Sequence, residues 1–220
     1  MLLTRYGLRE WLTITVVSLL LALGAAWLAW WWAVAIVAVL CLALLSFFRD
    51  PLFRKPRSAD PKDLPSPADG TVSAVFTVPA HEATGGQPAL VIRIFLSVLN
   101  VHINRAPCDG EVVGIAHRPG KYLDARTEES AAVNESNLVT LRVASGDRIG
   151  VRQVSGAIAR RIVCPIGVGS RLRRGERYGM IKFGSTTELI LPHPERSKAL
   201  VTKGDKVVGG VTIIARCEWM

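Results

Sequence analysis

The chain of 220 residues has room for one compact domain and an additional segment. Half of its residues are hydrophobic and its formal charge is +9, which favours anionic partners. Its four cysteines form neither a Cys-x-x-Cys pair nor a Cys/His cluster of zinc spacing. The composition therefore argues against a disulfide-stapled fold and predicts reduced thiols with no metal site.

An apolar run from Trp11 to Phe48 contains 38 residues without Asp, Glu, Lys or Arg. One straight helix of this length would be about 57 Å long, whereas each half matches the ~30 Å hydrocarbon core of a bilayer. Tryptophan favours the membrane interface, so residues 27–32, with four tryptophans, predict the turn of a hairpin. We expect a membrane anchor over residues 1–48, with a helix lying partly in the interface as the alternative.

Basic residues flank the apolar run on both sides, with Arg5 and Arg9 before it and Arg49 and Arg54 after it. The positive-inside rule then places both ends of the run, and the domain that follows, on the cytoplasmic face of the cell membrane. Beside such an anchor, the basic charge indicates anionic lipid rather than nucleic acid. Residues 49–67 carry five prolines and are predicted to form an extended linker.

Short β-branched runs separated by turn signals fill the remaining domain, residues 68–220. The predicted strands are Thr71 to Val78, Ala89 to Leu96, Glu111 to Ile115, Leu138 to Val143, Ile149 to Val154, Ile158 to Val163, Glu188 to Leu191 and Val207 to Ala215. A further strand-like run covers Tyr178 to Phe183, and short helical turns are expected near Ser97, Ala131 and Gly167. We predict a mainly β, β-rich α+β domain: a sandwich or partly open barrel similar to biotinyl/lipoyl-type hairpin hybrids.

Gly184 and Ser185 lie between two of these strand-like runs. As a tripeptide, Gly-Ser-Thr is a common turn, but a Gly-Ser bond permits a specific reaction under strain. The serine oxygen can attack the glycine carbonyl and shift the peptide bond to an ester. Elimination of that ester leaves dehydroalanine, and its hydrolysis yields a pyruvoyl group.

Other candidate residues lie upstream of this bond. His102 ends a strand-like stretch with Asn104 and Arg105 close by, and Asp69 precedes Gly70 in a turn. A lone strand histidine and a turn aspartate are commonly structural. Their type still suits acid–base chemistry, so both stay candidates.

Three motifs occur in a fixed order behind the apolar anchor: Asp69-Gly70, residues 101–107 (VHINRAP) and residues 182–186 (KFGST). Together with residues 119–125, 133–136, 154–163 and 174–180, they resemble the phosphatidylserine decarboxylases, in particular the short form of that pyruvoyl-dependent family. The resemblance covers nearly the whole domain. It is the joint order of the motifs that is specific.

The resemblance implies self-cleavage between Gly184 and Ser185. Residues 1–184 would become a membrane-bound β chain and residues 185–220 an α chain that begins with a pyruvoyl group made from Ser185. This covalent pyruvate would form a Schiff base with the amine of phosphatidylserine, an anionic aminophospholipid, and CO2 would leave to give phosphatidylethanolamine. His102 is the expected proton donor for the resulting carbanion.

The resemblance also implies an Asp–His–Ser arrangement for self-cleavage, with Asp69 and Ser185 as its outer members. Longer members of the family carry a second histidine where this chain has Arg105. Either His102 serves both steps, or Asp69 and Arg105 polarise Ser185 without a dedicated base. Asn104 and Arg105 are therefore candidate supporting residues.

Two other functions fit the residues alone. A membrane-tethered carrier domain of biotinyl/lipoyl type would use Lys206, although its flanks are more typical of a strand entry. A serine hydrolase would use Asp69, His102 and Ser185, but the chain lacks a Gly-x-Ser-x-Gly elbow. The acyl chains of the lipid, a diacyl or ether backbone, and the oligomeric state stay open.

Overall fold

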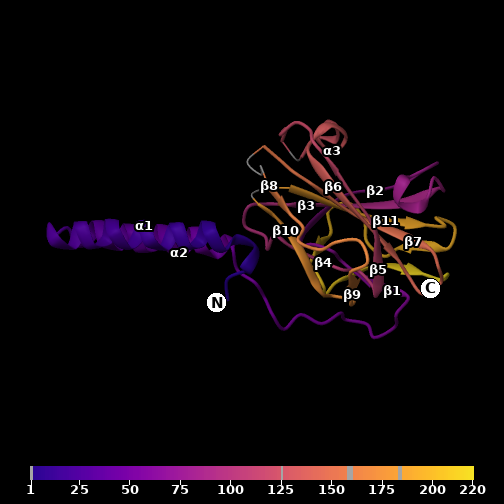
Figure 1. Cartoon of the computed structure of the whole chain (residues 1–220), viewed down its shortest axis with the longest axis horizontal. Coiled ribbons are helices and arrows are strands. Elements are labelled where there is room, and N and C mark those ends of the chain that lie inside the picture. Colours follow the sequence, from indigo (N-terminus) through magenta and orange to yellow (C-terminus); the bar gives the residue numbers. More distant parts are fainter. Residues whose placement is uncertain (1, 125, 158–160, 183–184) are drawn as a thin grey trace. The chain divides into compact units, whose positions relative to one another are not determined.

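The computed structural model describes residues 2–124, 126–157, 161–182 and 185–220. The chain divides into two compact units, Met1–Phe53 and Arg54–Met220. Within the second unit, residues 54–67 pack with the domain instead of forming a separate linker. The first of the two units is helical, and the second is built from strands (Figure 1).

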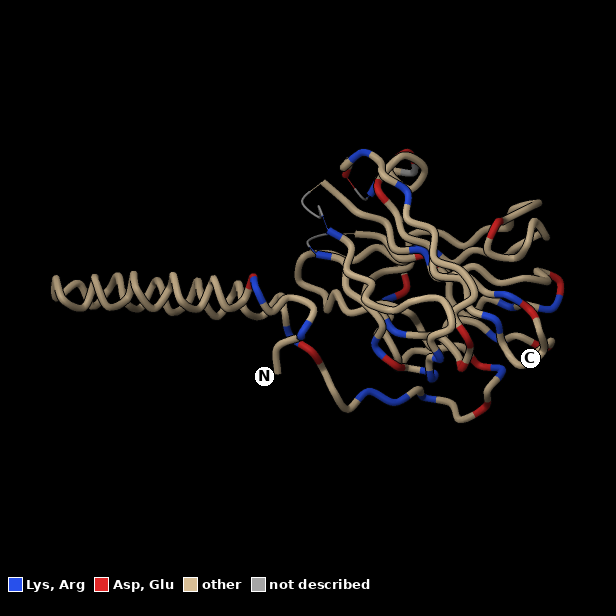
Figure 2. The backbone as a smooth tube through the Cα atoms, in the orientation of Figure 1, with Lys and Arg blue, Asp and Glu red and all other residues tan. Residues whose placement is uncertain are grey.

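The first unit is a helical hairpin, as the sequence predicts. A 3-10 turn, η1 (Arg5–Gly7), leads into α1 (Leu8–Trp27), and α2 (Trp31–Phe47) returns after a turn at the tryptophan-rich segment. The turn is tight because Trp30 N–H donates to the Ala25 carbonyl at 2.8 Å. Most large apolar side chains of both helices are exposed, and Figure 2 shows charged residues only near one end of the hairpin.

The described hairpin contains one helical stretch, Arg5–Trp27, that is long and apolar enough to cross a membrane. The second helix is also apolar but has 17 residues, which correspond to about 26 Å. The ends of the hairpin are held together because Thr4 N–H donates to the Phe48 carbonyl and Asp50 N–H to the Leu2 carbonyl, both at 2.8 Å.

The second unit holds three antiparallel sheets among the described residues. The largest is a curled half-barrel of eight strands in the order β13-β2-β3-β11-β7-β6-β5-β9, and the smaller ones are β4-β10-β8 and β1-β14-β12 (Figure 1). The strands are β1 (Asp63–Pro65), β2 (Gly70–Val78), β3 (Ala89–Leu96), β4 (Ile103–Arg105), β5 (Gly110–Arg118), β6 (Ser136–Arg142), β7 (Arg148–Val154), β8 (Arg161–Val163), β9 (Arg171–Leu172), β10 (Arg177–Lys182), β11 (Ser185–Pro192), β12 (Ser197–Ala199), β13 (Lys206–Val207) and β14 (Ile213–Cys217).

The predicted mainly β fold is confirmed, and most strands lie where alternation placed them. The short helical elements are η2 (Glu82–Thr84) and α3 (Glu128–Val133), the latter in the predicted neighbourhood of Ala131. The predicted strand from Val207 to Ala215 is wrong as one element: it splits into β13 and β14. Gly210 has φ 73°, a left-handed conformation that interrupts the strand and that glycine adopts without strain. The first part of the predicted strand Ile158 to Val163 lies outside the described residues.

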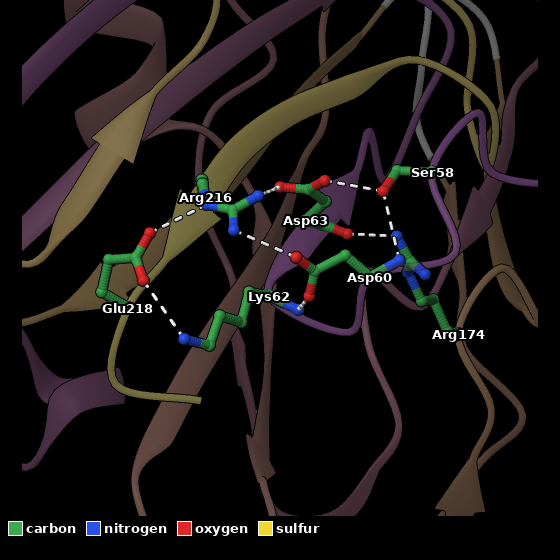
Figure 3. A network of polar contacts seen from close by, with 7 residues as sticks. All are labelled: Ser58, Asp60, Lys62, Asp63, Arg174, Arg216 and Glu218. Atoms are coloured by element: carbon green, nitrogen blue, oxygen red, sulfur yellow. Dashed lines mark hydrogen bonds and ion pairs between the residues drawn. The ribbon is translucent and has the colours of Figure 1, made fainter.

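The segment before β1 is tied to β14 by charged side chains (Figure 3). Arg216 on β14 contacts Asp60 at 3.0 Å, Asp63 at 2.9 Å and Glu218 at 2.8 Å. Lys62 adds an ion pair with Glu218 at 3.2 Å. Together with the pairing of β1 to β14, this network explains why residues 54–67 of the predicted linker belong to the domain.

The main hydrophobic core lies against one face of the large sheet. It includes Ile92 and Ile94 of β3, Val151 of β7, and Leu189 and Leu191 of β11. Side chains alternate between the faces of a strand, so Ser185 and Thr187 lie on the same face of β11 as these two leucines. The first residue of β11 therefore faces the interior of the domain.

Candidate active site

Ser185 is the first residue of β11, a central strand of the large sheet. It pairs with Leu96 at the end of β3, and the next residue, Thr186, pairs with Val154 at the end of β7. Ser185 is fully buried, and its hydroxyl oxygen has no hydrogen-bond partner in the described part of the chain. Gly184, the other half of the predicted cleavage site, lies outside the described residues.

His102 is fully buried just before β4. Its Nδ1 lies 2.9 Å from the carbonyl oxygen of Asn100, an atom that only accepts hydrogen bonds. Nδ1 therefore carries a proton and donates it to this carbonyl, which holds the orientation of the ring.

The backbone of His102 accepts from Ile181 N–H at 3.2 Å. Ile181 belongs to β10, which ends at Lys182, three residues before Ser185. The pairing of β4 with β10 thus brings His102 alongside the strand that leads to the Gly184–Ser185 bond. A strand of three residues achieves this, and no local pattern in the sequence indicates it.

Asp69 lies at the start of β2, on the other side of β3 from Ser185. Thr71 of β2 and Thr186 of β11 both pair with Phe95, so Asp69 and Ser185 lie at the same end of the sheet. Two strand spacings separate them, which amounts to about 10 Å.

The Asp69 carboxylate is occupied by other partners. Arg54 makes a bidentate ion pair with it, and Gly209 N–H donates to its Oδ1 at 2.9 Å. Within the described ranges, no hydrogen bond joins Asp69 to His102. The uncut chain thus brings His102 and Ser185 to neighbouring elements while Asp69 is paired with Arg54, a residue that sequence reasoning did not assign to the site.

Asn104, a predicted supporting residue, is the centre of a buried amide chain. Its Nδ2 donates to Thr187 Oγ1 at 3.0 Å, and its Oδ1 accepts from Gln153 Nε2 at 2.9 Å. Gln153 Oε1 accepts in turn from Asn137 Nδ2 at 3.0 Å. All four side chains are buried. The chain joins β4, which follows His102, to β11, which begins with Ser185, and so fixes the two elements relative to each other.

Arg105, the second predicted supporting residue, is buried and its Nη1 donates to the carbonyl of Gly175 at 3.0 Å. Its backbone N–H donates to the Pro67 carbonyl at 2.9 Å. These contacts fasten the β4 end to the turn before Asp69 and to the turn before β10. They give Arg105 a clear structural role beside whatever it contributes to chemistry.

The opposite face of β11 carries a buried ion cluster. Glu188 accepts from Arg93 Nε at 2.7 Å and from Arg152 Nη1 at 3.3 Å. Arg152 also donates to the Ala131 carbonyl of α3 at 2.7 Å. Its three members lie on β3, β11 and β7, so the cluster links these strands on the face of the sheet opposite Ser185.

In the described ranges, no group of three or more His, Cys, Asp or Glu side chains is placed to hold a metal ion. The arrangement is instead a buried hydroxyl, a buried histidine whose Nδ1 contacts a backbone carbonyl, and neutral amides. Such a set suits proton transfer and nucleophilic attack.

Comparison with known proteins assigns the chain to a family. Residues 41–215 match the family model described as phosphatidylserine decarboxylase. The chain belongs to this family.

Curated relatives of the phosphatidylserine decarboxylase family are similar over most of the chain. A phosphatidylserine decarboxylase proenzyme of Pelobacter propionicus is 46% identical over 182 residues, covering 83% of this chain and 80% of the relative. One of Rhodopirellula baltica is 42% identical over 219 residues, covering 97% and 88%. Another, of Burkholderia multivorans, is 39% identical over 195 residues, covering 89% and 85%.

Sequence reasoning missed several polar residues around this family's motifs. Thr187, Gln153 and Asn137 look like ordinary strand residues, and Arg54 looks like part of a basic linker. A weak signal existed in the strands: Asn137 and Gln153 are polar where alternation calls for an inward apolar side chain. That they form one hydrogen-bonded chain depends on the strand register, which sets Gln153 opposite both Thr187 and Asn137.

Proposed function

We propose that the chain is a phosphatidylserine decarboxylase that is made as a proenzyme and cleaves its own Gly184–Ser185 bond. The observation that carries this proposal is the buried hydroxyl of Ser185, which lacks a hydrogen-bond partner in the described part of the chain. Ser185 begins the strand that Asn104, two residues after His102, contacts through Thr187. Family membership names the reaction, and this hydroxyl supplies the group that the reaction needs.

Self-cleavage begins when Ser185 Oγ attacks the carbonyl carbon of Gly184. The C–N bond breaks, the new C–O ester forms, and the amine of Ser185 is released. Loss of the Ser185 α-proton then expels the Gly184 carboxylate and leaves dehydroalanine, which water converts to pyruvoyl with release of ammonia. His102 is the base in this proposal, because its buried imidazole precedes β4, which Asn104 ties to β11 through Thr187.

The environment of Ser185 fits a pyruvoyl group. The serine hydroxyl gives up no hydrogen bond to the described residues when it is converted, and Leu96 beside it presents an apolar wall. When formed, the group supplies an electron sink for loss of a carboxylate from a bound amine. His102 then holds the proton that the product carbon needs, and the amide chain through Asn104 keeps β4 in place beside β11.

The cleaved fragments stay together in this proposal. Residues 185–220 contain β11, which has ladder hydrogen bonds to β3 and β7 on its two sides, and β14, which pairs with β1. These strands also bury Leu189, Leu191 and Ile214. The product is therefore a heterodimer of a 1–184 chain and a 185–220 chain, held by a shared sheet and core.

A lipid substrate accounts for the first unit. Arg5–Trp27 is long and apolar enough for a membrane segment, and we place the domain on the cytoplasmic face because basic residues flank the hairpin. Beside the site, the turn after β3 exposes Val98 (46%) and Leu99 (80%). Apolar side chains at this position suit a substrate whose headgroup lies at a bilayer surface.

Intact-mass analysis of the purified chain tests the proposal. We expect two fragments that meet at Gly184 and Ser185, the smaller one lighter by one ammonia than a hydrolytic fragment and without a free amine. Ser185→Ala should stay one chain, and His102→Ala should lose CO2 release from phosphatidylserine vesicles. His117→Ala is the matched control, since that exposed ring pairs with Glu135. An uncut parent chain, or a fully processed and active His102→Ala, would contradict the proposal.

A further inference from the structure

A second buried serine hydroxyl lies next to the proposed cleavage site. Ser155 is fully buried, and its Oγ, like that of Ser185, has no hydrogen-bond partner among the residues that the structure describes. Its backbone is well satisfied: the N–H donates to the Glu135 carbonyl, and the carbonyl accepts from Asn134 Nδ2, both at 2.9 Å. The residue is thus held firmly in place, and only its hydroxyl has no structural task.

The strand register brings Ser155 beside Ser185. Thr186 pairs with Val154, the last pair at this end of the antiparallel ladder between β11 and β7. Continued by one residue, this register would set Ser185 opposite Ser155. Directly opposed residues of an antiparallel pair lie on the same face, with Cβ atoms about 4.5–5.5 Å apart. On the other side of Ser185 stands Leu96, which brings no polar side-chain atom.

A buried hydroxyl without a partner is unfavourable, and alanine would fill the same place without that cost. The chain nevertheless keeps two such hydroxyls side by side. Two other buried atoms without a partner, on Glu135 and Arg174, lie on side chains that already contact His117 and the Asp63 carbonyl. Ser155, by contrast, follows Val154, whose ladder partner Thr186 adjoins Ser185, where atoms change their charge in the proposed reaction.

We propose that Ser155 is a catalytic residue of self-cleavage: its hydroxyl donates a hydrogen bond to the oxygen of the Gly184–Ser185 bond that becomes negatively charged. Attack by Ser185 Oγ pushes the carbonyl electron pair onto the Gly184 oxygen, and collapse of this state breaks the C–N bond. The Ser155 proton stays on Ser155 throughout. A donor aimed at developing charge gains strength in the transition state, which is why it needs no partner before the reaction. This assignment rests on the proposed function.

The test compares Ser155→Ala with a matched serine in the full-length membrane-extracted protein. Freshly made precursor is followed by intact mass, and Tm is measured in the uncleavable Ser185→Ala background. For Ser155→Ala we expect cleavage at least about tenfold slower, since loss of one such donor typically costs ~10²–10³ in rate. Its Tm should be unchanged or raised, because an unpaired buried hydroxyl has been removed.

Ser197→Ala is the matched control. Ser197 is also buried, but its Oγ donates to the Pro192 carbonyl at 2.6 Å and accepts from Trp219 Nε1 at 2.7 Å. Its loss should lower Tm and leave cleavage at the parent rate. Ser155→Cys keeps a side chain of similar size and a weak hydrogen-bond donor, so it should cleave faster than Ser155→Ala. This variant also keeps the test valid if Ser155→Ala fails to fold.

Cleavage of Ser155→Ala at the parent rate would overturn the inference, as would slow cleavage that Ser155→Cys shares in full. A lowered Tm of Ser155→Ala that matches that of Ser197→Ala would also overturn it, because the hydroxyl would then be structural. Failure of the proposed function gives a different result: the parent chain itself would stay uncut.

Discussion

Replacing Thr187 with valine tests whether the buried amide chain holds β11 in place. Thr187 is fully buried, and its Oγ1 is the acceptor for Asn104 Nδ2 at 3.0 Å. Valine is similar in size but cannot accept, so the substitution leaves a buried amide donor unpaired. Such a group costs about 1–3 kcal/mol. For a domain of this size each kcal/mol lowers Tm by roughly 2–4 °C, so we expect a decrease of about 2–12 °C.

The assay is thermal unfolding in detergent at one fixed scan rate, with all variants in the Ser185→Ala background so that every sample is a single chain. Thr77→Val is the matched control, because Thr77 also lies on a strand of the large sheet but is exposed. Exposed substitutions of this kind usually change stability by less than about 0.5 kcal/mol. Equal Tm values for Thr187→Val and Thr77→Val would refute the reasoning and show that the amide chain contributes nothing to the hold on β11.

Three further perturbations follow from the domain. Glu188→Gln leaves its two partly buried arginine partners short of a countercharge and should cost about 3 kcal/mol, seen as a lower urea midpoint; an unchanged midpoint would contradict this. Arg216→Ala should speed tryptic cutting before β1, whereas Lys198→Ala, on the neighbouring strand, should not. Burial raises the pKa of Cys217 to about 12, so at pH 8 the thiolate fraction is ~10⁻⁴. Iodoacetamide should therefore modify Cys217 only after unfolding. Labelling of Cys217 itself in the folded chain at pH 8 would rule this out.

The sequence alone was enough for features that depend on neighbouring residues. The apolar run and its tryptophan cluster predicted the helical hairpin, because segment length and side-chain polarity decide whether a helix suits a bilayer. β-Branched runs between turn signals predicted the long strands such as β2 and β3, because branched side chains favour the extended backbone and turn residues interrupt it. The order of motifs around Asp69, His102 and Ser185 pointed to the family that the comparisons show.

Tertiary structure decided everything that depends on register between distant strands. The short strand β4 forms because β10 supplies its hydrogen bonds, and its three residues are too few to show a period of their own. The ion pair of Asp69 with Arg54 joins a domain turn to a segment that composition marks as linker. Val154 and Thr186, which adjoin Ser155 and Ser185, become neighbours only because β7 and β11 pair in one register, and a slip of one residue would turn every side chain of the strand to the other face. Local composition does not determine this register. It is determined by the core that both strands share.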